Sequence, residues 1–218
     1  MSEWKIAGIR ERDLEEEAAA LYSDALPYHN FGHVLTTLAS AEEILGRCAQ
    51  EGIRVDARIV YLSLLFHDAG YQHDHRELGH PTKEHYSAAL ARDCLQRRRH
   101  GPQLLRKVEL AILGTMRDGR FDTAEQKAVR AADLAGLAAA YDVFLENTVR
   151  LWHEHEVLTG CRMSWTEWVA STQEIVRHYL SQEIRLTSFY LDTHGKSAFH
   201  VLALENLARL GSERAPGE

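Results

Sequence analysis

The sequence predicts an all-α protein, and three observations support that fold class. Only four of the 218 residues are proline. Between the prolines, apolar residues recur every three or four positions, which is the period of an amphipathic helix and not that of a strand. N-capping residues fall where these periodic segments begin, and glycines fall where they end. Because 218 residues are about 1.5 times the ~150 residues of a usual domain, we expect one helical domain over residues 1–218.

The periodic segments place eight helices along the chain. Their expected ranges are 11–23, 31–50, 56–69, 82–98, 102–116, 123–158, 165–181 and 198–210. The third segment is apolar on nearly every side, so we expect it at the centre of the bundle. Gly136 is a point where the longest segment can bend or break. Two pairs, Ser164 with Glu167 and Asp122 with Glu125, have the spacing of a capping box.

Composition and charge exclude several classes of protein. Hydrophobic residues make up 45% of the chain and charged residues 26%, a balance that supports a buried core and argues against disorder. The formal net charge of -7 argues against general binding to nucleic acid or to an anionic membrane. No apolar run reaches the ~18 to 20 residues that cross a bilayer, and no secretory signal is recognisable, so we expect a cytoplasmic protein.

Residues that bind metals are unevenly represented. The three cysteines form no CxxC pair, which argues against a disulfide framework and against a thiolate zinc site. Histidine, in contrast, occurs 13 times. Any metal chemistry should therefore depend on imidazole and carboxylate groups.

Three segments carry such groups where a core stripe is expected. In YHNFGH, His29 and His33 are four positions apart and share one helix face if the helix begins early enough. His67 and Asp68 close the most apolar segment, where an unpaired carboxylate is costly. Asp133 lies among small apolar residues. Taken singly, each has a structural alternative: two surface histidines, an Asp68 that only bonds His67 or a helix N-terminus, and an Asp133 that faces solvent.

Taken together, the three segments favour a metal site between core helices. They supply two imidazole nitrogens and two carboxylates, from His33, His67, Asp68 and Asp133. This set of ligands suits a divalent ion such as Mn, Fe, Co, Ni, Zn or Mg, and suits Ca less. We therefore predict that these four side chains meet at one cation.

The order of these motifs, YHNxxH, then FHDxGY, then ADL, resembles the HD-domain superfamily of metal-dependent phosphohydrolases. The resemblance covers about residues 28–152, and residues 164–210 are then additional C-terminal helices. A further segment, KEHYSA at 83–88, is similar to the Glu-x-x-Ser-Ala segment of a small bacterial branch of predicted HD hydrolases. The resemblance implies an HD-type helical bundle, and it implies that the four residues named above are the metal ligands.

The resemblance also implies a reaction. A water molecule activated by the metal would attack a phosphoester bond in a small molecule, a nucleotide being the expected substrate. His29 matches a histidine that protonates the leaving oxygen in relatives, a role that suits an imidazole. Glu84 is expected to orient the water or to bond a ligating histidine, with binding of a second metal as an alternative. Lys83, Arg117 and Arg120 are candidate phosphate contacts, although single basic residues are more often plain surface charges.

Two alternatives remain open beside a hydrolase: an HD-fold di-iron oxygenase and a non-catalytic module that senses nucleotides. The sequence departs from many dinuclear relatives, because Arg117 and Asp118 stand where further histidine ligands are expected. Four histidines in the polar loop after Asp68 and at the start of the next expected helix could replace them: His73, His75, His80 and His85. A solvated polar loop is the favoured interpretation of that segment.

Overall fold

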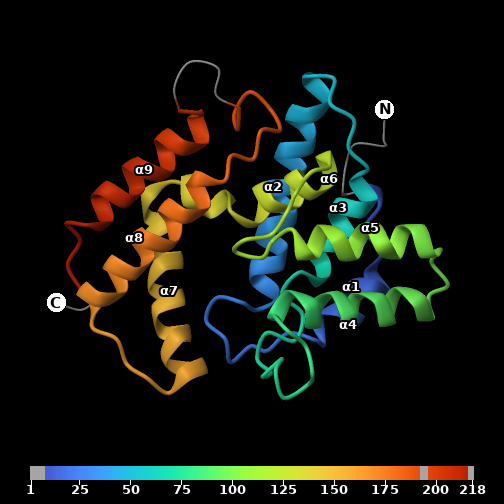
Figure 1. Cartoon of the computed structure of the whole chain (residues 1–218), viewed down its shortest axis with the longest axis horizontal. Helices are drawn as coiled ribbons and strands as arrows, with labels where there is room; N and C mark the ends of the chain where they lie inside the picture. The colour runs from blue at the N-terminus through green and yellow to red at the C-terminus, as the bar shows by residue number, and fades with distance from the viewer. Residues whose placement is uncertain (1–7, 192–195, 216–218) are drawn as a thin grey trace. The chain divides into compact units, whose positions relative to one another are not determined.

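The computed structural model describes residues 8–191 and 196–215, shown as a cartoon in Figure 1. This part of the chain contains nine α-helices and no strand, which confirms the predicted all-α class. None of its helices is both long and apolar enough to span a membrane. The chain forms two compact units, and the prediction of one domain over residues 1–218 stays a prediction.

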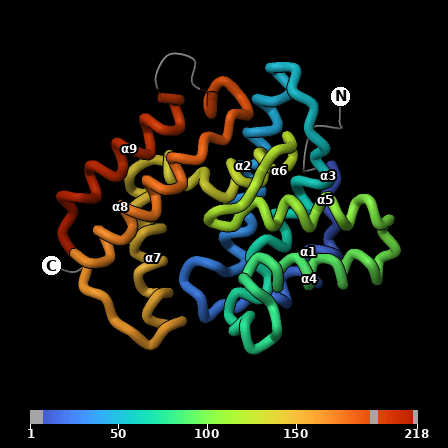
Figure 2. The backbone as a smooth tube through the Cα atoms, viewed as in Figure 1, coloured from blue at the N-terminus to red at the C-terminus, as the bar shows by residue number. Residues whose placement is uncertain are grey.

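Unit 1 contains the described residues up to Ala25, together with His29–Asp133. Its helices are α1 (Arg12–Ala19), α2 (Phe31–Gln50), α3 (Ala57–Phe66), α4 (Lys83–Arg97), α5 (Pro102–Leu113) and α6 (Ala124–Asp133). Helix α3 contacts each of the other five, and all its residues except Arg58 are buried. The apolar sequence of α3 thus explains its central place, as predicted. Figure 2 traces the loop that leads from α3 to α4.

Unit 2 contains Leu26–Tyr28 and the described residues from Leu134 onward. Its elements are the short 3-10 helix η2 (Ala135–Ala138), α7 (Tyr141–Thr159), α8 (Trp165–Ser181) and α9 (Ala198–Leu210). The three α-helices contact one another, and η2 contacts α7 and α9. The rings of Trp152 and Trp165 meet edge to face with centroids 5.3 Å apart, so these tryptophans are packing residues.

The long helix expected over 123–158 is divided in the structure. Helix α6 ends at Asp133, η2 follows, and α7 begins at Tyr141. The break includes Gly136, as predicted, and a Cβ at this position would lie 3.1 Å from the side chain of Asn147. The division matters for the site, because it places Asp133 at the end of a helix.

One of the two predicted capping boxes is confirmed and the other is wrong. Ser164 and Glu167 form the box at the start of α8. At the start of α6 the box lies one residue later than predicted: the Gln126 amide donates to Thr123 Oγ1 (3.3 Å), and the Thr123 amide donates to Gln126 Oε1 (2.9 Å). The Glu125 carboxylate instead accepts a hydrogen bond from a backbone amide before α3. A glutamine at N3 serves as well as a glutamate, which is why the neighbouring pair was misleading.

Candidate metal centre

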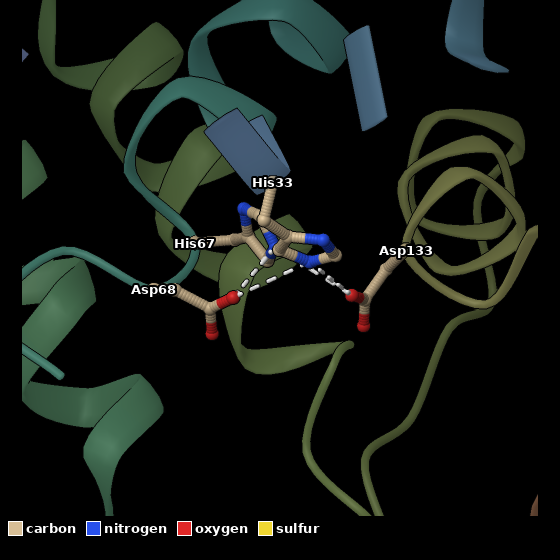
Figure 3. Close-up of side chains that lie close together, drawn as sticks. All are labelled: His33, His67, Asp68 and Asp133. Carbon is tan, nitrogen blue, oxygen red and sulfur yellow. Dashed lines mark ion pairs between the residues drawn. The ribbon is translucent and has the colours of Figure 1, made fainter. Parts of the chain in front are cut away.

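Four side chains of unit 1 converge at one place, as Figure 3 shows: His33, His67, Asp68 and Asp133. His33 lies in the first turn of α2. His67 and Asp68 directly follow α3, and Asp133 is the last residue of α6. One ligand atom of each residue lies within 4.8 Å of the other three, so the group could hold a metal ion. These are the four residues predicted from the sequence, and we call them the His/Asp cluster.

The start of α2 is set by Asn30, and this decides how His29 reaches the site. The Asn30 side chain accepts hydrogen bonds from the amides of Gly32 (2.8 Å) and His33 (3.4 Å), so the helix begins at Phe31. His29 therefore precedes the helix, and the condition that His29 and His33 share a helix face is not met. Their ring centroids nevertheless lie 5.9 Å apart.

The end of α3 turns the chain into the site. The helix was expected to run to residue 69, but it ends at Phe66. Two hydrogen bonds hold the turn that follows: the Gly70 amide donates to the Leu21 carbonyl (2.9 Å), and the Ser87 hydroxyl donates to the Ala69 carbonyl (2.9 Å). These long-range bonds hold the turn after the helix, from which the buried His67 and the partly buried Asp68 reach the cluster.

Glycine is required at position 70 for two reasons. Gly70 has φ +76°, in the left-handed region that L side chains rarely adopt. A Cβ there would lie 2.5 Å from a ring carbon of Tyr86 and 2.9 Å from Leu90. Tyr86 and Leu90 belong to α4, so the turn packs tightly against that helix. Ser87 of the KEHYSA segment also holds this turn against α4, through its hydrogen bond to the Ala69 carbonyl.

The hydrogen bonds of His67 leave one of its ring nitrogens facing two carboxylates. Nδ1 lies 2.8 Å from the Leu64 carbonyl, which can only accept, so Nδ1 carries a proton and donates it. Nε2 lies 2.9 Å from Asp68 Oδ2 and 3.5 Å from Asp133 Oδ1. It is buried and forms no well-aligned hydrogen bond with any described residue. In the neutral ring this places a lone pair against two acceptors, an arrangement that either a proton on Nε2 or a metal cation between the three groups would stabilise.

The electrostatics of the cluster favour such a cation. Burial lowers the pKa of His33 below its usual value. Burial also opposes the charge on His67, but Asp68 and Asp133 outweigh it and raise the pKa of His67 well above its usual value. The neighbouring histidines likewise outweigh burial at both carboxyls, and the pKa of Asp68 and of Asp133 is lowered. Two carboxylates thus stay ionised, and a divalent ion that replaced the His67 proton would balance their charge.

The donor set also fits a divalent metal chemically. Imidazole nitrogen and carboxylate oxygen together suit borderline ions. The bond from His67 Nδ1 to the Leu64 carbonyl fixes the ring orientation, as the outer partners of metal-bound histidines usually do. The side chains of Asp68 and Asp133 are 15% and 21% exposed, so the carboxylates lie toward solvent while the His67 ring is enclosed.

His29 and Lys83 are joined by a residue to which sequence analysis gave no role. The His29 ring stacks on Tyr71 with centroids 3.7 Å apart and an interplanar angle of 10°. The Lys83 ammonium lies 3.5 Å from the Tyr71 ring centroid and donates to the Tyr71 hydroxyl. Tyr71 ends the FHDxGY motif, so an aromatic residue three positions after Asp68 was the signal that could have revealed it.

The remaining predicted site residues lie on α4 and on the loop before α6. Glu84 is half-buried in the first turn of α4. Arg117 and Arg120 are exposed in the loop between α5 and α6. Their proposed roles in catalysis and phosphate binding stay predictions.

The histidines of the loop after α3 do not extend the cluster. Among residues 8–191 and 196–215, no second group of three or more His, Cys, Asp or Glu side chains is close enough to hold a metal. His73 and His80 instead lie near the ring of Tyr86, with centroids 6.2 and 5.1 Å from it. The alternative of loop histidines as additional ligands is therefore not supported.

A buried arginine beside the cluster was missed. Arg130, three residues before Asp133, has no exposed surface. Its guanidinium donates to four backbone carbonyls, those of Gly114 (3.1 Å), Thr115 (3.0 Å), Met116 (2.6 Å) and Arg117 (3.4 Å). These contacts hold the chain after α5, which ends at Leu113 and not at the expected residue 116. An arginine inside the apolar sequence AVRAA was the available signal.

Comparison with known proteins adds no family. A scan against protein-family models found no match, and no curated protein is significantly similar in sequence. The resemblance to HD-domain phosphohydrolases therefore rests on the motifs alone and stays a prediction.

Proposed function

We propose that this protein is a metal-dependent phosphohydrolase that cleaves a phosphoester bond in a small molecule, with a nucleotide as the expected substrate. The observation that supports it most strongly is the His/Asp cluster, in which His67 Nε2 faces two carboxylates without a well-aligned hydrogen bond to a described residue. The motif resemblance supplies the class of reaction.

The four residues of the cluster would hold the ion. Asp68 and Asp133 contribute the negative charge, and His67 contributes Nε2 because its Nδ1 proton is given to Leu64. The chemistry that a divalent ion supplies when bound is activation of a water molecule and neutralisation of charge on the phosphoryl oxygens. One group of ligands favours a single ion over a di-iron centre.

His29 is proposed to protonate the leaving oxygen. It lies outside the group of four, yet its ring is 5.9 Å from that of His33. It is half-buried and its ring plane is held by Tyr71, so it can present a ring nitrogen at a defined place. A proton donor beside a metal site, but separate from the ligands, is what cleavage of a phosphoester with an alkoxide leaving group requires.

The test begins with metal content and a panel of substrates. The purified chain is loaded separately with Mn, Fe, Co, Ni, Zn or Mg and assayed on phosphomonoesters, cyclic nucleotides and nucleoside triphosphates. We expect hydrolysis of at least one class with a redox-inert ion. A fully loaded protein that hydrolyses none of them contradicts the proposal, and two irons per chain with O2 consumption would support the oxygenase alternative.

The role of His29 is tested by His29→Ala. We expect metal content near that of the wild type and turnover lower by ~100 to 10,000-fold, the range for a lost general acid. His153→Ala, which changes an exposed histidine of unit 2, is the matched control and should alter neither quantity. Loss of the metal in His29→Ala would instead make His29 a ligand.

A further inference from the structure

We propose that Tyr71 positions His29 for proton transfer, and that Lys83 acts through Tyr71 and not primarily as a phosphate contact. The inference rests on the proposed function, because it concerns the group proposed to protonate the leaving oxygen. It assigns a role to Tyr71 and a different role to Lys83.

The helix that follows His29 does not fix its side chain. Asn30 starts α2 by capping the amides of Gly32 and His33, so His29 lies in the irregular segment before the helix. Its orientation must therefore come from side-chain contacts. The parallel stack on Tyr71, 3.7 Å between centroids and 10° between planes, provides one. A stack uses the face of the imidazole, so it sets where the two ring nitrogens lie without bonding to either.

The backbone of Tyr71 is fixed to the turn that carries two cluster residues. The Tyr71 amide donates to the Asp68 carbonyl at 3.2 Å. The same turn is held by Ser87 at the Ala69 carbonyl and by Leu21 at the Gly70 amide. One rigid turn thus presents His67 and Asp68 to the cluster and Tyr71 to His29. The distance between the proton donor and the cluster is therefore set by this turn.

Lys83 makes a second contact with the Tyr71 ring, beside the stack with His29. It is the first residue of α4, and its ammonium lies over the ring, 3.5 Å from the centroid, and donates to the hydroxyl. This contact restrains rotation of the phenol, and so it maintains the stack with His29. A lysine with this role should affect turnover, whereas a lysine that binds the phosphate should affect KM.

The first experiment measures the stack without any assay of activity. In the labelled full-length protein, the ring protons of His29, assigned by comparison with His29→Ala, should be shifted upfield by the ring current of Tyr71. Tyr71→Phe should preserve this shift, and Tyr71→Leu should abolish it. A His29 resonance that does not change in Tyr71→Leu overturns the inference.

The second experiment uses the leaving group. A nitrophenolate departs without a proton, whereas a nucleoside alkoxide requires one. The two substrates are a phosphate ester of a nucleoside (the nucleoside ester) and a phosphate ester of nitrophenol (the nitrophenyl ester). For the nucleoside ester, Tyr71→Leu should lower kcat by about 100-fold, the cost of misplacing a catalytic group by ~1 Å. For the nitrophenyl ester it should change kcat little, and KM should be unchanged for both. Tyr71→Phe should retain most of the activity.

Lys83→Met separates the two roles of the lysine, and it also serves if Tyr71→Leu does not fold. A positioning role predicts a lower kcat for the nucleoside ester alone, and non-additive effects when combined with Tyr71→Leu. A higher KM for both esters would show a phosphate contact and would overturn this part of the inference. Lys107→Met, at an exposed position of α5, is the matched control.

The outcomes also separate this inference from the proposed function. If the wild type hydrolyses neither ester with any metal, both fall. If it hydrolyses them but Tyr71→Leu lowers kcat equally for both esters, the proposed function stands and the positioning role of Tyr71 is wrong.

Discussion

Two groups of buried charge lie close together along α6, and the fold treats them in opposite ways. The Arg130 guanidinium is buried and donates to four backbone carbonyls of the loop after α5. Three residues later, Asp133 faces His67 Nε2, which has no well-aligned hydrogen bond to a described residue. Both groups are expensive to bury.

The difference separates a buried charge that is held by the chain's own carbonyls from a group of side chains that could hold a metal ion. The chain itself supplies carbonyl acceptors for both terminal nitrogens of Arg130, so this group stabilises the loop between α5 and α6. The His/Asp cluster instead gathers two imidazoles and two carboxylates with ligand atoms within 4.8 Å of one another, a group that could hold a metal ion. The following predictions test that contrast.

The largest expected effect is the loss of stability on removal of the Arg130 guanidinium. Arg130→Met keeps the length of the side chain but leaves the carbonyls of residues 114–117 without their donor. We expect the free energy of unfolding, measured by urea denaturation, to fall by about 3 to 5 kcal/mol. Arg120→Met, at an exposed position of the same loop, should change it by less than ~0.5 kcal/mol. Equal stability of Arg130→Met and the wild type would break the comparison.

The second effect is the stabilisation that a divalent ion should give through the His/Asp cluster. A divalent ion at ~100 times its Kd should stabilise the wild type by about 2.7 kcal/mol, a rise in Tm of roughly 5 to 11 °C. Asp133→Ala should show no such rise, because the cluster loses a ligand. Asp142→Ala, at an exposed position of α7, is the control and should respond like the wild type. The same metal-induced rise in Asp133→Ala would show that the ion binds elsewhere.

A smaller effect is expected for Glu84, a charge at the start of a helix. If it orients water or a ligating imidazole, Glu84→Gln should lower hydrolysis or metal affinity by ~10 to 100-fold. If it only complements the helix dipole, the variant should lose less than ~1 kcal/mol of stability and nothing else. Glu174→Gln, at an exposed position of α8, controls for the loss of one negative charge. Unaltered hydrolysis and metal binding would remove Glu84 from the site.

The smallest effect concerns Glu17, a partly exposed carboxylate of α1 whose partners all belong to α4 and its end. Hydrogen bonds from Arg97, and then from the Cys94 thiol and Arg98, lower the pKa of Glu17 from 4.5 to about 2. A lowered carboxyl pKa stabilises the native state above pH 4.5, and this contribution is lost as the pH falls toward 2. The Glu17 side chain is 34% exposed, so the effect should be small and should weaken with salt.

The measurement for Glu17 is the Tm across that range of pH, at low and at high salt. The wild type should lose more stability on acidification than Glu17→Gln, and the difference should shrink at high salt. An equal fall in Tm on acidification in the two proteins would show that the three partners of Glu17 contribute nothing measurable to the stability of the native state.

Where helix ends depend on adjacent residues, the sequence predicts them well. The helices at 31–50, 165–181 and 198–210 were predicted with the bounds that the structure has. Each begins after a side chain that caps it, Asn30, Ser164 and Ser197 respectively. The capping bond joins residues two or three positions apart, so a short stretch of sequence contains all the information it needs.

Where an end depends on distant residues, the prediction was wrong. The end of α3 at Phe66 follows from contacts of its turn with Leu21 and Ser87. The end of α5 at Leu113 accompanies the contacts of Arg130 with the next residues. Neither partner can be identified from the residues next to the helix end.

The sequence by itself thus determined the helical class, the central place of α3 and the residues of the His/Asp cluster, because apolar period and misplaced polar groups are properties of contiguous residues. Only the tertiary structure decided that His67 Nε2 faces two carboxylates, that Arg130 donates to backbone carbonyls and that His29 stacks on Tyr71. These contacts join residues that are separated along the chain, and which of them form depends on how the helices pack and where their turns direct each side chain.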